Sequence, residues 1–309
     1  MSGQPKVSIG MPVFNGERFI ADTIDSILAQ TFADFELIIS DNASTDGTEE
    51  IGRRYAAKDD RIRYVRNREN LGAAHNYNQA FYLSSGSYFK WACHDDILRP
   101  AFLEQCVEVL DRDPSAVGVY TGWAPIDEVG NRLDKYPARY PPWRADAPDP
   151  VSRTRFSFRM ERRPPSAIYG LFRSDTLRRT GLYRPIHGGD HIMIAEISLY
   201  GTVNEVPEEL FLNRWHAESG GKIPTFRERV NWWLPESRRG RTGEGRIGAL
   251  FLFGKTMAQT AKAQIDSIRR SPLTPSDKLR CYWQLPLWFA GEFWRRLEPR
   301  LPERLGGRK

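Results

Sequence analysis

The chain contains little cysteine and no long apolar run. Its 309 residues include only Cys93, Cys106 and Cys281, which are odd in number and lack the paired spacing of a zinc site. No stretch approaches the roughly 18 consecutive apolar residues of a membrane span. The first six residues lead directly into an apolar strand pattern rather than into a signal peptide. We therefore expect no disulfide framework, no zinc site and a cytoplasmic location.

Glycine-rich nucleotide motifs are also missing. No Gly-x-Gly-x-x-Gly follows the first predicted strand, and no complete Gly-x-x-x-x-Gly-Lys-Ser/Thr pattern occurs. These absences disfavour dinucleotide-dependent oxidoreductases and P-loop ATPases. We also find no internal repeat and no low-complexity tract.

Charge is distributed unevenly along the chain. Residues 1–120 contain 12 Lys and Arg against 18 Asp and Glu, whereas the remaining residues contain 33 against 21. A basic second part suits a phosphorylated substrate or anionic lipid headgroups. Because no motif resembles a nucleic-acid-binding module, we expect no nucleic acid partner.

Two adjacent carboxylates, Asp95 and Asp96, follow an apolar strand pattern that begins at Tyr88. The carboxyl ends of strands in an open parallel sheet bind ligands, and carboxylate oxygens there suit Mg²⁺ or Mn²⁺ bridging to a diphosphate. The alternative is that both residues only cap the helix that is predicted after Pro100.

Strands and helices alternate through the first part of the chain. Strand patterns occupy residues 7–12, 35–40, 61–65 and 88–93, and an amphipathic helix follows each of them. This order predicts an α/β fold, with a mostly parallel sheet flanked by helices and right-handed crossovers.

Four motifs in this part resemble those of family 2 glycosyltransferases with the GT-A (Rossmann-like) fold. Residues 12–17 are similar to the family's Pro-x-Tyr-Asn-x-Glu, residues 41–47 to its Asp-Asp/Asn-x-Ser-x-Asp-Gly, and residues 70–76 to its Asn-x-Gly segment. His94, Asp95 and Asp96 stand where the family carries Asp-x-Asp. The resemblance covers residues 7 to about 120 strongly and continues to about 216. Phe14 replaces the commoner Tyr, and His94 takes the first place of the acidic triplet.

The resemblance implies an enzyme of the hexosyltransferase type that moves a sugar from a nucleotide-diphosphate sugar, with inversion, to a saccharide or lipid-linked acceptor. It implies that Asp95 faces the ribose or sugar, and that Asp96 binds a divalent Mn²⁺ or Mg²⁺ cofactor. The residues that it assigns to the nucleoside and the nucleotide pocket are Pro12, Phe14, Asn15, Glu17, Asp41, Asn70, Gly72 and Asn76.

Asp190 and His216 are two further candidates. Asp190 follows Gly188 and Gly189 at the start of a predicted helix, where it could serve only as a cap. The resemblance implies instead that Asp190 is the general base toward the acceptor hydroxyl, with Gly189 in place of a second acid. His216 ends an alternating apolar pattern, and the resemblance implies a place in the metal or diphosphate site. A lone His is also common at the surface or in a core.

The second part of the chain is organised more loosely. We expect residues 1–220 to form the GT-A domain, with a nucleotide-binding half over 1–120 and an acceptor half over 121–220. Within the acceptor half we predict a long binding loop or linker over 137–165, a strand over 167–173 and two closing strands over 203–206 and 209–216. Residues 221–246 are predicted as a flexible basic segment, which either closes over the donor or is a solvated linker.

Residues 247–309 predict a C-terminal helical extension that is broken at Pro272 and Pro275. An apolar stripe recurs there at Leu285, Phe289, Phe293 and Leu297, beside tryptophans and arginines. Such a stripe can lie on the inner face of the plasma membrane, pack on the preceding helix, or join a second copy in a homodimer.

The leading hypothesis is therefore a glycosyltransferase in cell-surface polysaccharide or glycolipid synthesis. Two alternatives are a nucleotidyltransferase on a similar sheet and a non-catalytic nucleotide-sugar-binding protein. A nucleotidyltransferase should carry a glycine-rich phosphate loop after the first strand, which this sequence lacks. A binding protein would have no need of a base such as Asp190.

Overall fold

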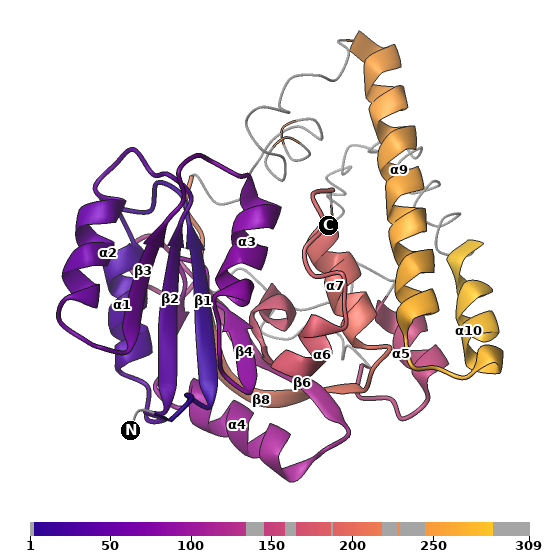
Figure 1. Cartoon of the computed structure of the whole chain (residues 1–309), viewed down its shortest axis with the longest axis horizontal. Helices are drawn as coiled ribbons and strands as arrows, with labels where there is room; N and C mark the ends of the chain where they lie inside the picture. The colour runs from indigo at the N-terminus through magenta and orange to yellow at the C-terminus, as the bar shows by residue number, and fades with distance from the viewer. Residues whose placement is uncertain are drawn as a thin grey trace, which may run out of the picture.

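A single mixed sheet runs through the protein in the computed structural model (Figure 1). The structure describes residues 3–133, 145–157, 165–186, 188–217, 228, 231 and 245–286, with residues 154–157, 165 and 245–253 described by backbone alone. The strand order is β3-β2-β1-β4-β7-β6-β8-β5. Strands β1 (Val7–Val13), β2 (Phe35–Asp41), β3 (Ile62–Arg66) and β4 (Tyr88–Trp91) are parallel to one another. The predicted α/β fold is confirmed.

The other half of the sheet contains both orientations. Strand β7 (Leu171–Arg173) is antiparallel to β4 and to β6 (Ala116–Ile126). Strand β8 (Thr202–Arg214) is parallel to β6, and the short β5 (Ile97–Leu98) is antiparallel to β8. The antiparallel β5 returns the chain across the sheet directly after Asp95 and Asp96.

Two hydrophobic layers cover the sheet because its strands alternate their side chains between the two faces. Helices α1 (Ile20–Leu28), α2 (Thr48–Ala56) and α4 (Phe102–Arg112) contribute to the layer on one face. Helices α3 (Ala73–Tyr82), α6 (Ser174–Arg178) and α7 (Gly189–Ile197) contribute to the layer on the other. In β4, Phe89 and Trp91 join the second layer, so the intervening Lys90 points into the first.

Helices α5 (Pro150–Ser157), α9 (Gly245–Arg270) and α10 (Pro275–Tyr282) form a further layer beside α7 (Figure 1). Helix α9 ends at Arg270, just before the break predicted at Pro272. Thr274 then caps α10, since its hydroxyl accepts a hydrogen bond from the Asp277 amide. None of the helices in the described ranges is long and apolar enough to span a membrane.

Three predicted elements differ in the structure. The strand expected over 167–173 is a 3-10 helix (Pro165–Tyr169) followed by the three residues of β7. A short apolar run is compatible with either a strand or a 3-10 helix. In the structure, Tyr169 packs against the second hydrophobic layer. The two closing strands are one strand, β8, whose register against β6 shifts near Pro207. The loop predicted over 137–165 contains α5.

Several predictions fall outside the described residues. These are residues 137–144 and 158–164 of the loop over 137–165, most of the basic segment over 221–246, and the apolar stripe beyond residue 286. Leu285, the first member of that stripe, is buried against Ile268 and Cys281.

Candidate functional site

The loops that follow β1 and β2 are tied together by reciprocal hydrogen bonds. The amide of Asn15 donates to Ser44 Oγ (2.9 Å), and the Asn15 side-chain oxygen accepts from the amide of Thr45 (2.8 Å). Glu17 Oε2 accepts from the amide of Gly47 (2.6 Å). Asn15 has a left-handed φ of 53°, which Asn tolerates better than most residues. Asn15 and Glu17 therefore hold the second loop in place, and their role toward a nucleotide sugar stays a prediction.

Pro12 and Phe14 lie at the end of β1. Pro12 is buried beyond Gly10, the last residue of β1 that pairs with β4, so its missing N–H leaves no gap in that ladder. Phe14 is 41% exposed, although it directly follows a fully buried strand. Its exposed ring is available to a flat, partly apolar ligand such as a base.

Asp41 is completely buried at the end of β2. One oxygen accepts from the amide of Ser44 (2.8 Å), and the other accepts from the Tyr64 hydroxyl and from Arg66 Nη1 (2.8 Å). These contacts fix the loop between β2 and α2. The role of Asp41 toward a nucleoside stays a prediction, because its carboxylate is engaged inside the protein.

An amide network joins the third predicted motif to the same loops. Asn76 is buried in α3; it donates to the carbonyl of Ser40 (2.8 Å) and accepts from the Ser40 hydroxyl (2.7 Å). Asn70 Oδ1 accepts from the side chain of Asn42 (2.8 Å) and from the amide of Gly72 (2.9 Å). Gly72 has a φ of 79°, a conformation that favours glycine, and α3 begins directly after it. The network shapes this edge of the sheet, and the role of Asn70, Gly72 and Asn76 in a nucleotide pocket stays a prediction.

The acidic loop after β4 is held by the end of β8. Asp96 Oδ1 accepts from Asn213 Nδ2 and from the amide of Arg214, both at 2.9 Å. Arg214 Nε donates to the carbonyl of Asp95 (2.8 Å), and His216 Nε2 lies 2.9 Å from Asp95 Oδ2. Both carboxylates are therefore fixed by residues more than 110 positions away in the sequence.

The two carboxylates differ in their electrostatic environment. Burial opposes ionisation of Asp95, but the hydrogen bond from His216 and nearby histidine charge outweigh it and lower the Asp95 pKa. Burial raises the pKa of Asp96 well above its ordinary value, and the negative charge of Asp95 raises it further. A cation at this loop would relieve the cost of ionising Asp96.

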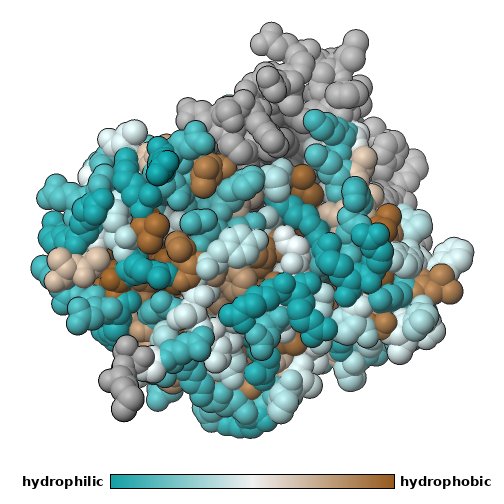
Figure 2. All heavy atoms as spheres, viewed as in Figure 1, coloured by the Kyte–Doolittle hydropathy of each residue, from teal (hydrophilic) through white to brown (hydrophobic). Residues whose placement is uncertain are grey.

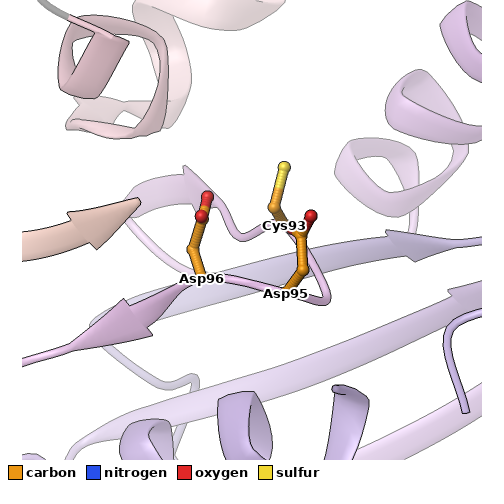
Figure 3. Close-up of side chains that lie close together, drawn as sticks. All are labelled: Cys93, Asp95 and Asp96. Atoms are coloured by element: carbon orange, nitrogen blue, oxygen red, sulfur yellow. The ribbon is translucent and has the colours of Figure 1, made fainter. Parts of the chain in front are cut away.

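The donor set fits a divalent cation. Asp96 Oδ2 is buried, and within the described residues it has no hydrogen-bond partner. Cys93, Asp95 and Asp96 each offer a ligand atom, and these atoms all lie within 4.8 Å of one another. Their side chains project to the same side of the loop (Figure 3). An unpartnered buried carboxylate oxygen is a suitable ligand for Mg²⁺ or Mn²⁺.

His216 was expected at the metal or diphosphate site, and the structure places it beside that cluster. It is 4% exposed, its ring packs on Phe19 at 4.8 Å, and its Nε2 contacts Asp95. It is not one of the three residues whose ligand atoms converge. Direct metal ligation by His216 stays a prediction, and the observed contact orients Asp95.

Asp190 lies in the first turn of α7 with a quarter of its side chain exposed. Gly188, with a φ of 75°, is the N-cap residue of this helix, and Asp190 Oδ2 lies 3.8 Å from His191 Nε2. Burial raises the pKa of Tyr183, and the nearby groups Asp190 and Cys93 raise it further. Tyr183 also packs on Tyr77 at 4.5 Å. Asp190 and Cys93, which precedes the acidic loop, therefore both lie near this buried tyrosine.

Three site residues were not identified from the sequence: Asn213, Arg214 and Lys90. Asn213 and Arg214 follow an ordinary alternating strand, and only the pairing of β8 with β5 brings them to Asp96. Lys90 is fully buried, its Nζ donates to the carbonyl of Trp91 (2.8 Å), and burial lowers its pKa to about 8. A lysine within an apolar strand pattern was the available signal for this residue.

Comparison with known proteins identifies the family. The model of Glycosyl transferase family 2 matches residues 8–176, which is more than half of the chain. The chain belongs to glycosyl transferase family 2. The family resemblance read from the four motifs is confirmed.

Two relatives from Bacillus subtilis (strain 168) align with this family 2 chain. EpsE, which is named as a glycosyltransferase, is 39% identical over 133 residues, or 43% of this chain and 48% of EpsE. TuaG, named as a glycosyltransferase of teichuronic acid biosynthesis, is 35% identical over 133 residues, or 43% of this chain and 52% of TuaG. The chain thus matches about half the length of each of these relatives.

Solved structures share the fold of this family 2 chain. TarS (1–349) of S. aureus has a TM-score of 0.65 and 15% identity, over 97% of this chain and 76% of TarS (1–349). TarS has also been solved with UDP-GlcNAc. The mannosyltransferase PcManGT of Pyrobaculum calidifontis, in complex with GDP-Man and Mn²⁺, has a TM-score of 0.52 and 16% identity, over 95% of this chain and 88% of PcManGT. The predicted GT-A fold is confirmed.

Proposed function

We propose that the protein transfers a sugar from a nucleotide-diphosphate sugar to a hydroxyl of a saccharide or lipid-linked acceptor, with inversion at the anomeric carbon. The observation that carries this proposal is the buried Asp96 Oδ2, which has no hydrogen-bond partner in the described part of the chain and lies beside Asp95 at the sheet edge where β1, β2 and β4 end. Family membership supports a sugar donor, and the complexes of TarS with UDP-GlcNAc and of PcManGT with GDP-Man and Mn²⁺ illustrate such donors on this fold.

The proposed donor site is built from residues that the structure already fixes. Phe14 presents an exposed ring at the end of β1 to a base, and the loops around Asn15 and Asp41 form the edge that faces the nucleotide. Asp96, with Asp95 and Cys93 nearby, would hold a divalent cation. When bound, such a cation stabilises negative charge on the departing diphosphate.

Asp190 is the proposed general base. An inverting transfer needs a base on the side of the sugar opposite the diphosphate to take the acceptor proton. The carboxylate of Asp190 is partly exposed, and both Asp190 and Cys93, which precedes the acidic loop, lie near Tyr183; this common neighbour supports a site shared by Asp190 and the acidic loop. His216 orients Asp95, and Asn213 and Arg214 orient Asp96.

The acceptor is proposed from chemistry rather than from a pocket. TuaG, by its name, acts in the synthesis of a cell-surface polymer, and we extend that setting to this chain. The excess of Lys and Arg after residue 120 suits an acceptor that carries a phosphate, such as a lipid-linked sugar. Exposed Leu279 in α10 and Trp283 directly after this helix add apolar surface in the described part of the C-terminal extension.

A panel of nucleotide sugars tests the proposed function. The protein is incubated with Mn²⁺ and each UDP-, GDP- or TDP-sugar, with and without simple glycoside acceptors, and nucleotide release and thermal stabilisation are followed. We expect one donor to raise the melting temperature and to release its nucleotide in the presence of an acceptor. Stabilisation without release in any combination would indicate a binding protein, and formation of a nucleoside triphosphate and a sugar phosphate when pyrophosphate is added would indicate a nucleotidyltransferase.

A further inference from the structure

Helix α7, which carries Asp190, also carries a carboxylate that is shielded from solvent. The side chain of Glu196 has no exposed surface. Its Oε2 accepts from Arg184 Nη2 and from the amide of Gly181, both at 3.1 Å, and its Oε1 accepts from Arg270 Nη2 (2.7 Å) and Nε (3.3 Å). The position of a buried carboxylate with several hydrogen-bond donors is tightly fixed, because the loss of one donor leaves its negative charge uncompensated.

The donors around Glu196 come from two different segments. Gly181 and Arg184 belong to the segment that leads into α7, whereas Arg270 is the last residue of α9. Arg184 Nη2 also lies 3.2 Å from Ser267 Oγ of α9. Glu196 therefore joins the end of α7, the approach to its start, and the C-terminal extension.

Apolar packing acts in the same direction along the contact between α7 and α9. Ile192 of α7 packs with Ile186 and with Ala263 of α9 in one small cluster. Near the other end, Ala195 and Leu199 pack with Ile268, Cys281 and Leu285. Figure 1 shows α9 lying alongside α7. The polar and apolar contacts together fix how far α7 is shifted along α9.

The segment before α7 links the contacts of Glu196 to the turn that contains Asp190. The amide and carbonyl of Tyr183 both bond to the side chain of Asn78 on α3, at 3.0 and 2.9 Å. A Cβ at Gly189 would lie 2.2 Å from the carbonyl oxygen of Arg184, so this backbone packs directly on the first turn of α7. Arg184 thus touches the turn that contains Asp190 and binds Glu196 at the other end of the helix.

We infer that Glu196, held by Arg184 and Arg270, is a positioning residue that fixes α7 and its Asp190 relative to the acidic loop. The inference rests on the proposed role of Asp190 as the base. Helix α9 then contributes to the acceptor half of the site, because Arg270, which binds Glu196, lies in the last turn of α9. A displacement of about 1 Å at a reacting group can lower a rate by about 100-fold, so this constraint affects transfer directly.

Three variants and a matched control test the inference. Glu196→Gln and Arg270→Met remove the ion pair between Glu196 and Arg270, Arg270→Lys keeps a positive charge there, and Lys262→Gln removes an ion pair of the 77% exposed Lys262 with Asp266 on the same helix. We expect Glu196→Gln and Arg270→Met to lower kcat by about 10- to 100-fold. Their affinity for the donor, measured by calorimetry, should stay within about twofold of wild type, because the donor loops do not touch Glu196. Arg270→Lys should retain most of the activity, and Lys262→Gln should match wild type.

Hydrogen exchange gives a second readout that does not depend on turnover. The amides of residues 189–197 should exchange faster in Glu196→Gln and Arg270→Met than in Lys262→Gln. If Glu196→Gln fails to fold, Arg270→Met decides, because the Arg270 side chain is 38% exposed and its loss is better tolerated. A folded Arg270→Met protein with the kcat and exchange of the control, or with equal losses of kcat and donor affinity, overturns the inference. A wild type that transfers no sugar refutes the proposed function instead, and exchange still reports the coupling.

Discussion

Replacing Asp96 by Asn should make the metal-free protein more stable at neutral pH. Asp96 Oδ1 accepts two hydrogen bonds from the end of β8, and an Asn side-chain oxygen can accept the same two. Oδ2 is buried without a partner among the described residues, so the carboxylate is poorly compensated when it is ionised. Asn fills the same volume without the charge.

The sign follows from the raised pKa of Asp96. Burial and the charge of Asp95 raise this pKa in the folded protein above the ordinary 3.8, so the folded state disfavours ionisation. The resulting loss of stability is absent below the unfolded pKa and grows as the pH rises toward the folded pKa. Relief of a buried, poorly compensated charge is worth about 1–3 kcal/mol, which corresponds to several degrees in Tm for a chain of this size.

Thermal unfolding in EDTA and in Mn²⁺, from pH 5 to 8, measures this effect. In EDTA at pH 7 the Asp96→Asn protein should melt several degrees above wild type, and the difference should shrink as the pH falls. Mn²⁺ should raise the Tm of wild type alone. Asp59→Asn is a control of opposite sign, because the hydrogen bond from Arg61 lowers the Asp59 pKa and its loss should reduce stability. An Asp96→Asn protein that is less stable than wild type in EDTA, or that responds equally to Mn²⁺, would refute the reasoning.

Three further predictions concern other parts of the chain. Because burial lowers the Lys90 pKa from 10.5 to about 8, the unfolding free energy should rise by up to about 3 kcal/mol between pH 8 and 10.5; Lys90→Met should flatten this rise in urea titrations, and an unchanged slope would contradict it. Gly189→Ala should lower both stability and transfer because its Cβ would meet the Arg184 carbonyl at 2.2 Å, whereas Gly254→Ala, with open space around it, should stabilise α9 by up to about 1 kcal/mol; equal melting temperatures for the two variants would count against this packing. In liposome flotation, the full chain should bind anionic vesicles at low salt, and Trp283→Ser should weaken binding; no flotation of the full chain would assign the C-terminal extension to packing or to a dimer.

The sequence was sufficient for the nucleotide-binding half because its signals are local. The strands from β1 to β4 are short, and a helix follows each of the first three within a few residues and follows β4 after the acidic loop and β5, so residue order alone implies parallel pairing. The loop with Asp95 and Asp96 could be placed for the same reason. The position of β5 could not, since two residues carry no periodicity and their partner in β8 lies more than 100 residues away.

Contacts of long range explain the remaining differences. Nothing near Asp96 in the sequence indicates that Asn213 and Arg214 hold it, because only sheet pairing brings them together. Residues 167–169 resemble part of a strand, but they belong to a 3-10 helix, and the Tyr169 hydroxyl accepts from Cys93 Sγ at 2.9 Å. The sequence around Glu196 shows only an acidic residue in a short helix. Its partner Arg270 lies in α9, far along the chain, and only the packing of α9 on α7 brings the two together.

Figure 2 shows one face of the surface of the protein, coloured by hydropathy. On the face shown, apolar residues occur in small groups among polar ones. Leu279 in α10 and Trp283 directly after this helix are large apolar side chains that solvent reaches, at 58% and 70% exposure. Such isolated groups are common on soluble surfaces, so the flotation experiment, and not hydropathy, decides between membrane contact and packing.

The most direct measurement separates donor binding from sugar transfer in three proteins. Donor affinity in Mn²⁺ is measured by calorimetry, and transfer by single-turnover product formation, for wild type, Asp96→Asn and Asp190→Asn. Asp96→Asn should lose metal-supported donor binding and transfer together. Asp190→Asn should bind the donor as wild type does while its transfer falls by about 100-fold or more, because it lacks only the base. Transfer at the wild-type rate by Asp190→Asn, or undiminished metal-supported donor binding by Asp96→Asn, would contradict the assignment of these two carboxylates.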